Sequence, residues 1–389
     1  MKEKINQKEE QRKKAIALYK NKWNVKEICL ALKCSRNWFY KWQKRYQSKQ
    51  AKWYEEQSRS PKKVHNRRSK ETEEKIIKTR KVLIENPYMQ YGPQAIYYYL
   101  KEKGENPPPI WTITRVLREN KLSKPNRKHP YIPKGKKYPY EYNRCHQMDY
   151  VGPRYLSNKE KYYFNNILCC DTHYSQARIY SNQNSVNACE SLLEFWSEIG
   201  IPDYLQMDND ISFWGSIKEP TAIGKVIRLC LANKVIPVFI PQREPWRNGK
   251  IERFNDTMQQ AILCSAKYND LKELQKATYN FCKIHNESHH YSTQSGMTPI
   301  KRIAYLQNSN IRVEKNVVDP KKNQKPSSGE IHIIRFIRTD LNFYIFGINY
   351  KLPTEADHEY ILGKIDVNKN LLKIYNGQKM IAEYEFKIR

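Results

Sequence analysis

The sequence predicts a multidomain protein: a helical N-terminal region, an α/β core with a mixed sheet, and a small all-β barrel at the C-terminus. Three observations support this prediction. Apolar residues recur at helical spacing over residues 8–47 and 71–122, strands and helices alternate from residue 143, and short strands separated by turns follow residue 329. A chain of 389 residues has room for one sizeable core and smaller satellite domains.

The first domain, residues 1–50, is expected to form a helix-turn-helix. Ser35 is a favourable N-cap for its second helix, in which Phe39 and Trp42 lie on one apolar face. A short turn followed by a basic helix backed by aromatic residues is typical of DNA-binding units. An ordinary helical hairpin is the alternative, and the charge of the chain favours DNA. The residues expected to reach base edges and phosphates are Arg36, Asn37, Lys41 and Lys44.

A second helix-turn-helix-like unit is expected over residues 71–122. The three prolines at residues 107–109 force a break before its last helix, which carries the expected DNA contacts Arg115 and Arg118. The expected helices cover residues 71–85, 93–103 and 110–122, and basic linkers cover residues 51–70 and 123–142.

Residues 143–306 are expected to form the α/β domain, because three strands are followed by alternating helices and strands. A linker is expected at residues 307–328, and about five short strands over residues 329–389 predict the small barrel. The expected core strands cover residues 144–152, 161–171, 175–181, 203–208 and 235–240. The expected core helices cover residues 186–199, 219–233, 248–267 and 271–283.

The composition points to a polyanionic partner. Lys and Arg number 70 against 40 Asp and Glu, which gives a formal charge of +30. Nucleic acid neutralises such a charge by exchanging condensed counterions for basic side chains. An anionic membrane is the rival, but the mean hydropathy is −0.88 and the most apolar run, residues 235–240, is too short to span a bilayer. Nine cysteines without a C-x-x-C pair indicate reduced thiols in a cytoplasmic protein.

Three carboxylates have placements that suggest chemistry. Asp149 interrupts an apolar strand, Asp208 ends another, and Glu252 lies in the first turn of a long helix. The carboxyl ends of strands in open α/β sheets face the crevice where ligands bind, so these side chains are expected to meet at one edge of the sheet. Each acid alone has a structural alternative: an Asp at a strand end is often a turn residue, and a Glu in a first helical turn complements the helix dipole. The combination in so basic a chain favours a catalytic site.

Three neighbouring carboxylates cannot all stay ionised without a cation. Mg²⁺, or Mn²⁺, is the expected cofactor, because it takes oxygen ligands and leaves positions open for water and phosphate. Two ions would clamp an in-line displacement at phosphorus. In this arrangement Asp149 bridges both ions, while Asp208 and Glu252 each hold one.

Residues 143–302 resemble the catalytic core of retroviral integrases and of bacterial insertion-sequence transposases with an integrase-type core, which have a ribonuclease-H-like fold. HQMDYVGP resembles the strand with the first Asp of that family, and QMDND resembles its second-Asp motif. PWRNGKIERFN, residues 245–255, resembles the segment that carries the catalytic Glu. The helix-turn-helix regions and the small barrel resemble the flanking DNA-binding modules of the same group.

The resemblance implies a DDE transposase whose catalytic and metal-binding residues are Asp149, Asp208 and Glu252. The implied reaction is hydrolysis at a transposon end, which frees a 3′-OH, and attack of that 3′-OH on target DNA. The implied partners are the terminal inverted repeats, target DNA and further copies of the chain in a synaptic complex, in a cytoplasmic, nucleoid-associated setting. A catalytically silent DNA-binding regulator and a nuclease that cuts without joining are the alternatives.

The sequence also departs from the family pattern. Asp210 follows Asn209 where the family usually has Gly, the spacing from Asp208 to Glu252 is longer than usual, and residues 289–291 differ from the typical tail. Asp tolerates a left-handed backbone better than most residues, so the turn is expected to survive. Near the third acid, the side chains expected to approach a phosphate backbone are Asn248, Lys250 and Arg253.

Overall fold

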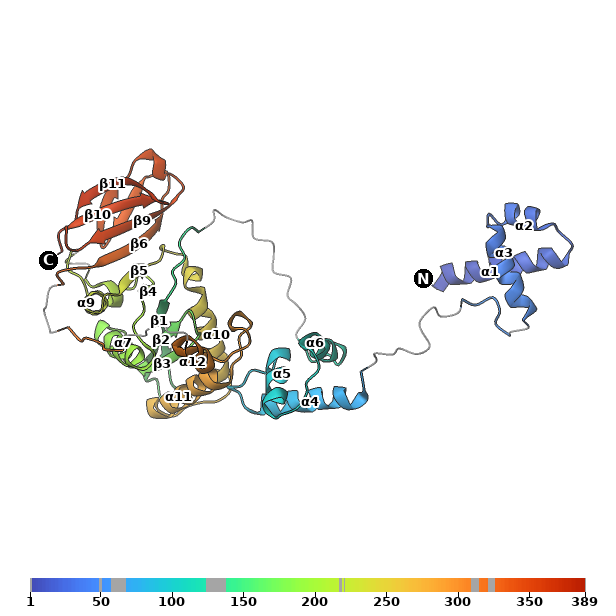
Figure 1. The fold of residues 1–389 in the computed structure, drawn as a ribbon, viewed down its shortest axis with the longest axis horizontal. Helices are drawn as coiled ribbons and strands as arrows, with labels where there is room; N and C mark the ends of the chain where they lie inside the picture. The colour runs from blue at the N-terminus through green and yellow to red at the C-terminus, as the bar shows by residue number, and fades with distance from the viewer. Residues whose placement is uncertain are drawn as a thin grey trace. The chain divides into compact units, whose positions relative to one another are not determined.

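The computed structural model describes residues 2–48, 51–56, 68–123, 138–216, 219, 221–308, 315–320 and 326–388. The chain divides into two compact units, Met1–Arg68 and Ser69–Arg389, which are drawn with their element labels in Figure 1. Most of the predicted linker at residues 51–70 lies outside the described residues.

The first unit consists of three helices, α1 (Lys2–Lys20), α2 (Val25–Ala31) and α3 (Arg36–Gln47). Their shared core contains Ala15, Ile28 and Phe39, which are fully buried. As predicted, Ser35 caps α3, and its Oγ accepts a hydrogen bond from the Trp38 amide at 3.1 Å. The helical N-terminal region is therefore confirmed.

The second unit begins with three helices, α4 (Lys70–Glu85), α5 (Pro93–Glu102) and α6 (Ile110–Glu119). They pack around Ile76, Ile96 and Val116, none of which is exposed. Helix α5 ends before Gly104, which has a φ of 75°, and the last proline of the run, Pro109, is the N-cap of α6.

The three helices α4–α6 are attached to the core through the tail that departs from the family pattern which the sequence resembles. The His289 ring contacts the carbonyl oxygen of Tyr88 at 2.7 Å, and the His290 ring stacks on Tyr98 at 4.0 Å between centroids. Gly296 has a φ of 78°, and a Cβ there would collide with the Tyr98 hydroxyl. Residues 289–296 thus form a docking surface for α5.

A mixed sheet of nine strands, among the described residues, forms the centre of the second unit, in the order β11-β10-β9-β6-β5-β4-β1-β2-β3. The pairs β1–β4, β4–β5 and β5–β6 are parallel, and the other neighbours are antiparallel. The first five strands are β1 (Cys145–Tyr155), β2 (Lys161–Cys169), β3 (Ser175–Tyr180), β4 (Tyr204–Met207) and β5 (Ile236–Phe239).

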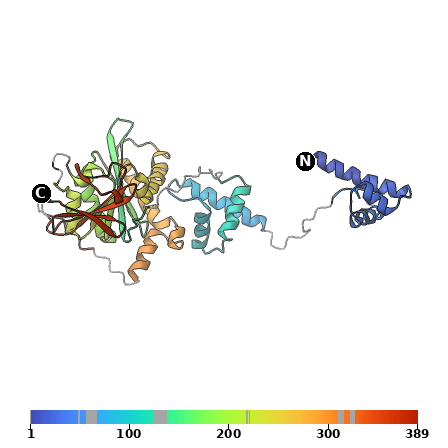
Figure 2. The same cartoon turned by 90° about the horizontal axis from the view of Figure 1, so that it is seen from above.

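Helices cover both faces of the sheet, and each face has its own apolar cluster. One face carries α7 (Ser185–Ile199), the short α8 (Ile211–Trp214) and α9 (Lys225–Ala232), packed around Met148, Phe195 and Leu205. The other carries α10 (Gly249–Leu263) and α11 (Leu271–Ser288), packed around Phe164, Phe254 and Phe281. Figure 2 shows α10 and the α7–α9 layer on opposite sides of the green strands. The tail continues into α12 (Pro299–Asn308).

Helix α9 begins later than the predicted 219–233 helix. Ile223 pairs with Gly215 in an isolated bridge, and Gly224 provides the N-cap. Because Ile223 is paired in the bridge and Gly224 is the N-cap, the helix begins at Lys225.

The C-terminal region is all-β, as predicted, but it continues the core sheet instead of closing as a separate barrel among the described residues. Strand β6 (Glu330–Phe336) pairs in parallel with β5, and β9 (Tyr360–Asp366), β10 (Leu371–Asn376) and β11 (Lys379–Glu385) follow. The hairpin of β7 (Asn342–Ile345) and β8 (Ile348–Lys351) forms its own two-stranded sheet, with Phe343 packed against Gly363 of β9. Strand β6 is therefore paired on both sides, and β11 and β3 are the edge strands of the nine-stranded sheet.

The end of the predicted 123–142 linker also differs from a solvated tether. Residues 124–137 lie outside the described part, but Tyr138, Tyr140 and Tyr142 pack on the face of β5, β6 and β9. The Tyr140 hydroxyl donates a hydrogen bond to the carbonyl of Tyr360 at 3.0 Å.

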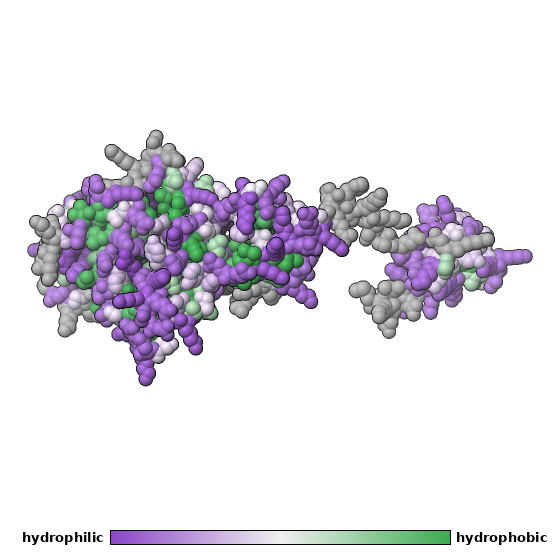
Figure 3. Space-filling view, turned by 90° about the horizontal axis from the view of Figure 1, so that it is seen from below, coloured by the Kyte–Doolittle hydropathy of each residue, from purple (hydrophilic) through white to green (hydrophobic). Residues whose placement is uncertain are grey.

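The outer surface is largely hydrophilic on the face drawn in Figure 3, with separate apolar patches. Within the described residues, every helix is too short or too polar to cross a bilayer. The nine cysteines are all free of disulfides, as predicted.

Candidate active site

Asp149 lies in the middle of β1, where the burial of the strand decreases toward its carboxyl end. Its Oδ2 accepts a hydrogen bond from Nδ2 of Asn255 at 2.7 Å. Burial, together with the charges of Asp208 and Glu252, raises the pKa of Asp149 to about 7. The charges of both other predicted acids therefore act on this carboxyl group.

Asp208 follows the last residue of β4, next to β1 in the sheet. Its Oδ1 accepts a hydrogen bond from the amide of Asp210 at 3.0 Å, and burial raises its pKa. Asp210, which replaces the expected Gly, caps the short helix α8 by accepting a hydrogen bond from the Ser212 amide. Its backbone φ is −67°, so the turn needs no left-handed residue here.

Glu252 lies in the first turn of α10. The helix is oriented by Ile251, Phe254 and Met258, which are buried against the sheet and leave Glu252 partly exposed. Burial and the charge of Asp256 raise the pKa of Glu252.

Two glutamines anchor the start of α10 to the strands that carry the aspartates. Gln147 and Gln206 are register partners on β1 and β4. Gln147 Oε1 accepts a hydrogen bond from the Ile251 amide at 3.0 Å, and Gln206 Nε2 donates to the carbonyl of Arg247 at 2.9 Å. Side chains two residues apart on a strand share a face, so each glutamine places the aspartate of its own strand toward α10.

This pair of glutamines was not among the predicted site residues, although the sequence contains a signal for it. The tripeptide Gln-Met-Asp occurs twice, at residues 147–149 and 206–208. In both copies the glutamine binds the helix start and the aspartate is a candidate catalytic acid. Asn255 and its own donor Asn166, at 2.7 Å, were also missed, because their contacts join α10 to β2 across the fold.

The three acids come from neighbouring elements, but they do not form a closed ligand cluster. Among the described residues, no group of three or more His, Cys, Asp or Glu side chains is arranged to hold a metal ion. Asp149 is affected by both other acids, whereas neither Asp208 nor Glu252 is among the charges that act on the other. The donors are all carboxylate oxygens, which suit Mg²⁺ or Mn²⁺ and not a soft metal.

The basic and polar residues predicted near Glu252 have different placements. Lys250 and Arg253 are exposed on α10, and Lys250 Nζ donates a hydrogen bond to the carbonyl of Cys170 at 3.0 Å. Asn248 is only 3% exposed, and its Oδ1 accepts a hydrogen bond from Gln206 at 3.0 Å. The prediction that Asn248 contacts a phosphate backbone is therefore not supported, because its amide is used to hold the helix start.

The predicted DNA contacts of the helical regions all lie on the surface. The four on α3 are exposed, and Lys41 also lies 3.4 Å from a carboxylate oxygen of Glu56. On α6, Arg115 and Arg118 are exposed, and Arg115 pairs with Glu119 at 3.3 Å. The four predicted contacts that are exposed on α3 are Arg36, Asn37, Lys41 and Lys44.

Comparison with known protein families identifies two domains in the chain. Residues 6–52 match the model of a homeodomain-like domain, and residues 233–299 match the model of an integrase core domain. The chain therefore contains a homeodomain-like helix-turn-helix domain and an integrase core domain, and the resemblance predicted from the sequence is confirmed. The integrase match includes Glu252 and the tail that docks α5.

Solved integrase cores are among the structures to which the chain is similar. The HTLV-2 integrase catalytic core domain in complex with magnesium, in its trimeric form, shares 16% sequence identity. That match covers 41% of this chain and 95% of the other, with a TM-score of 0.32. The catalytic core domain of BIV integrase shares 13% identity over 43% of this chain and 99% of the other, with a TM-score of 0.33.

Proposed function

We propose that this protein is a DDE transposase. It binds the terminal inverted repeats of a mobile element and catalyses metal-dependent strand cleavage followed by transfer of the 3′-OH to target DNA. The observation that carries the proposal is the site of Asp149, whose carboxyl group is affected by both Asp208 and Glu252 within a chain that contains an integrase core domain. In-line attack at phosphorus needs no covalent enzyme intermediate, so no nucleophilic side chain is required.

Asp149, Asp208 and Glu252 are the residues that would hold two Mg²⁺ or Mn²⁺ ions. Burial and neighbouring carboxylates raise the pKa of all three groups, so bound cations would offset an electrostatic cost at each of them. The ions would activate the attacking oxygen and stabilise the leaving oxygen. The chain itself supplies the alignment, through Asn255 on Asp149 and the two glutamines on α10.

DNA is the proposed partner on several surfaces. The exposed basic face of α3 would bind the element ends, and α6 would add phosphate contacts through Arg115 and Arg118. Lys250 and Arg253 would approach the backbone near the reacting phosphate. Cleavage and joining of two ends calls for a homo-oligomer in a synaptic complex, acting on chromosomal DNA in the cytoplasm.

The experiment that tests the proposal uses the full chain, a labelled element end and a plasmid target with Mg²⁺ or Mn²⁺. Asp149→Asn, Asp208→Asn and Glu252→Gln are each expected to abolish cleavage and strand transfer while DNA binding in EDTA stays within about twofold of the unchanged protein. Asp171→Asn is the matched control, since Asp171 lies just after β2 among other charged groups but outside the proposed triad. Near-normal activity in Glu252→Gln would overturn the assignment of the third acid.

A catalytically silent DNA-binding regulator is the second candidate. It is favoured by the finding that the three acids do not form a closed ligand cluster in the described part of the chain. It predicts sequence-specific binding without metal-dependent products. Cleavage without joined products would instead point to a nuclease, so the same assay separates the three functions.

A further inference from the structure

A buried arginine of the C-terminal strands lies against the loop that carries the second candidate acid. Arg335, in β6, is 7% exposed. Its guanidinium donates to Oδ1 of Asn209 at 2.8 Å, to the carbonyl of Ile240 at 3.2 Å and to the carbonyl of Tyr344 at 3.0 Å. Asn209 directly follows Asp208, so the guanidinium of Arg335 is hydrogen-bonded to the residue next to a candidate acid.

The charge of Arg335 has no carboxylate partner among the described residues, and the guanidinium donates to carbonyl and amide oxygens. Burial lowers its pKa to about 10, which still leaves it protonated at neutral pH. A buried cation without a counter-charge costs stability, so its retention calls for a role beyond packing.

Asn209 is held from three directions. Besides the contact with Arg335, its Nδ2 donates to the carbonyl of Ile240 at 2.7 Å, and its own carbonyl accepts a hydrogen bond from the Trp214 indole at 3.2 Å. The backbone that presents Asp208 is thereby fixed between β5, α8 and β6.

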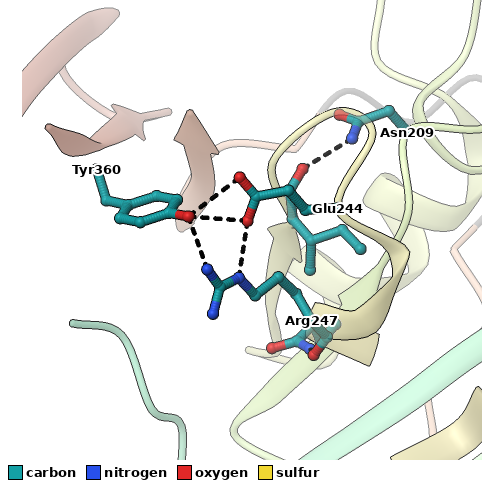
Figure 4. Close-up of polar contacts among 6 residues, drawn as sticks. Asn209, Glu244, Arg247 and Tyr360 are labelled. Carbon is teal, nitrogen blue, oxygen red and sulfur yellow. Dashed lines mark hydrogen bonds and ion pairs between the residues drawn. The ribbon is translucent and has the colours of Figure 1, made fainter. Parts of the chain in front are cut away.

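A second contact from the C-terminal strands holds the segment that leads into α10. The Tyr360 hydroxyl of β9 accepts a hydrogen bond from Arg247 at 2.7 Å and donates to the carboxylate of Glu244, as Figure 4 shows. Arg247 also pairs with Glu244 at 2.8 Å and lies under the ring of Tyr138 at 4.1 Å. The C-terminal strands thus contact both the Asp208 loop and the segment before Glu252.

We propose that Arg335 is a positioning residue, and that the C-terminal strands are a structural part of the candidate active site. Arg335 holds Asn209, and Asn209 fixes the direction in which Asp208 faces Asp149. The planar fork of arginine serves this role because its three nitrogens reach acceptors that lie apart, whereas the three donors of a lysine ammonium radiate from one atom. The inference rests on the proposed function, and its test has a readout that needs neither catalysis nor metal.

The first measurement is amide hydrogen exchange of the full chain in EDTA. Arg335→Met is expected to speed exchange of residues 208–214 about tenfold or more, because local opening of that loop becomes easier. Arg338→Met is the matched control: Arg338 is exposed, three residues further along the same segment, and should leave this loop unchanged. Unchanged protection of residues 208–214 in a folded Arg335→Met protein would overturn the proposal, whether or not the chain is a transposase.

The second measurement is a double-mutant cycle between Arg335→Met and Asn209→Ala, with cleavage rate and the Mn²⁺ concentration that raises Tm as readouts. Each single variant is expected to slow cleavage about 10- to 100-fold and to need about tenfold more Mn²⁺, while DNA binding in EDTA is unchanged. The double variant should lose little more than either one, because both act through one contact. Additive losses, or a normal response to Mn²⁺, would mean that Arg335 only stabilises the core.

Arg335→Lys and Asn209→Ala keep the proposal testable if Arg335→Met does not fold. Lysine retains the charge but offers one donor group, so loop protection and the Mn²⁺ response should be intermediate. Asn209→Ala leaves the arginine in place and should expose the loop to the same degree as Arg335→Met. A fully normal Asn209→Ala protein would also overturn the proposal. If the unchanged protein does not cleave DNA at all, the proposed function fails, and the exchange result still decides the role of Arg335.

Discussion

Asn255 of α10 donates a hydrogen bond to Asp149 of β1 at 2.7 Å and accepts one from Asn166 of β2 at the same distance. This chain of amides crosses from one strand through the helix to the neighbouring strand. Glu252 lies three residues before Asn255, one turn earlier on the same helix. The contact therefore sets the distance between the first and the third candidate acid.

The first prediction concerns this contact. Asn255→Ala removes the donor to Asp149, so its carboxyl group loses both its orientation and a hydrogen bond that favours the ionised form. We expect metal-dependent cleavage to fall about 10- to 100-fold while DNA binding in EDTA is retained. Gln260→Ala, an exposed position on the same helix, is the control and should cleave normally. Equal loss of binding and cleavage in Asn255→Ala would indicate general unfolding instead.

The second prediction concerns the pH dependence of stability without metal. The pKa of Asp149 is about 7 in the folded protein and 3.8 as its ordinary value, so the folded state holds the proton more tightly. This carboxyl group therefore favours the folded state at low pH, and that contribution is lost as pH rises from about 4 to 7. Asp149→Asn removes the free-energy cost of an ionised Asp149 in the folded state, which amounts to about 4 kcal/mol at most at pH 8.

Thermal unfolding in EDTA at pH 4.5 and pH 8 checks this expectation. Asp149→Asn should have a higher Tm than the unchanged protein at pH 8, and the gap should close at pH 4.5. Glu287→Gln, on the exposed side of α11, should follow the unchanged protein at both values. A lower Tm for Asp149→Asn at pH 8 would show that the carboxylate stabilises the metal-free fold.

Asp149 could be chosen as a candidate acid from the sequence because a carboxylate inside an apolar strand is visible without any tertiary information. The polar residues around the acids could not. An asparagine at a helix start is usually exposed, which is why Asn248 was predicted to contact DNA. It is buried because it accepts a hydrogen bond from Gln206, which lies on β4, far away in the sequence. Burial of a polar side chain depends on a partner supplied by the fold, which local spacing does not encode.

The strands of the C-terminal region were predictable for a related reason, but their pairing was not. Alternation and turn residues mark each strand locally, whereas the parallel register of Val238 with His332 joins segments far apart in the chain. Nothing in the pattern of β6 distinguishes the edge of a small barrel from an extension of the core sheet. The contact of Arg335 with Asn209 follows from this pairing, so it could not be predicted from the sequence either.

The third prediction tests the anchoring of α10. Gln206→Met keeps a side chain of similar length but leaves the Arg247 carbonyl and the Asn248 amide oxygen without this donor. We expect a loss of about 1–3 kcal/mol in the free energy of unfolding, measured by urea denaturation. Gln260→Met, at an exposed position of α10, is the control and should change stability little. An unchanged urea midpoint for Gln206→Met would mean that the helix start is held by its apolar face alone.

The last prediction concerns DNA binding by the first unit. Arg36 and Lys44 are exposed on α3, whereas Phe39 of the same helix is buried against Ile28. Each basic side chain that contacts a phosphate releases about one counterion, so Arg36→Ala and Lys44→Ala should each reduce the slope of log affinity against log salt by about 1. Lys26→Ala on α2 removes the same charge from a different helix and should change the slope less.

Lys41 provides an internal comparison on the same helix. Its ammonium group lies 3.4 Å from Glu56, so part of its charge is already neutralised within the unit. Lys41→Ala should therefore reduce the salt slope less than Lys44→Ala does, because fewer counterions are released when its site meets DNA. Filter binding of the full chain in EDTA from 50 to 300 mM salt measures all four slopes. Equal slopes for every variant would mean that α3 does not make these phosphate contacts, and Arg115 and Arg118 of α6, in the second unit, would be the next positions to change.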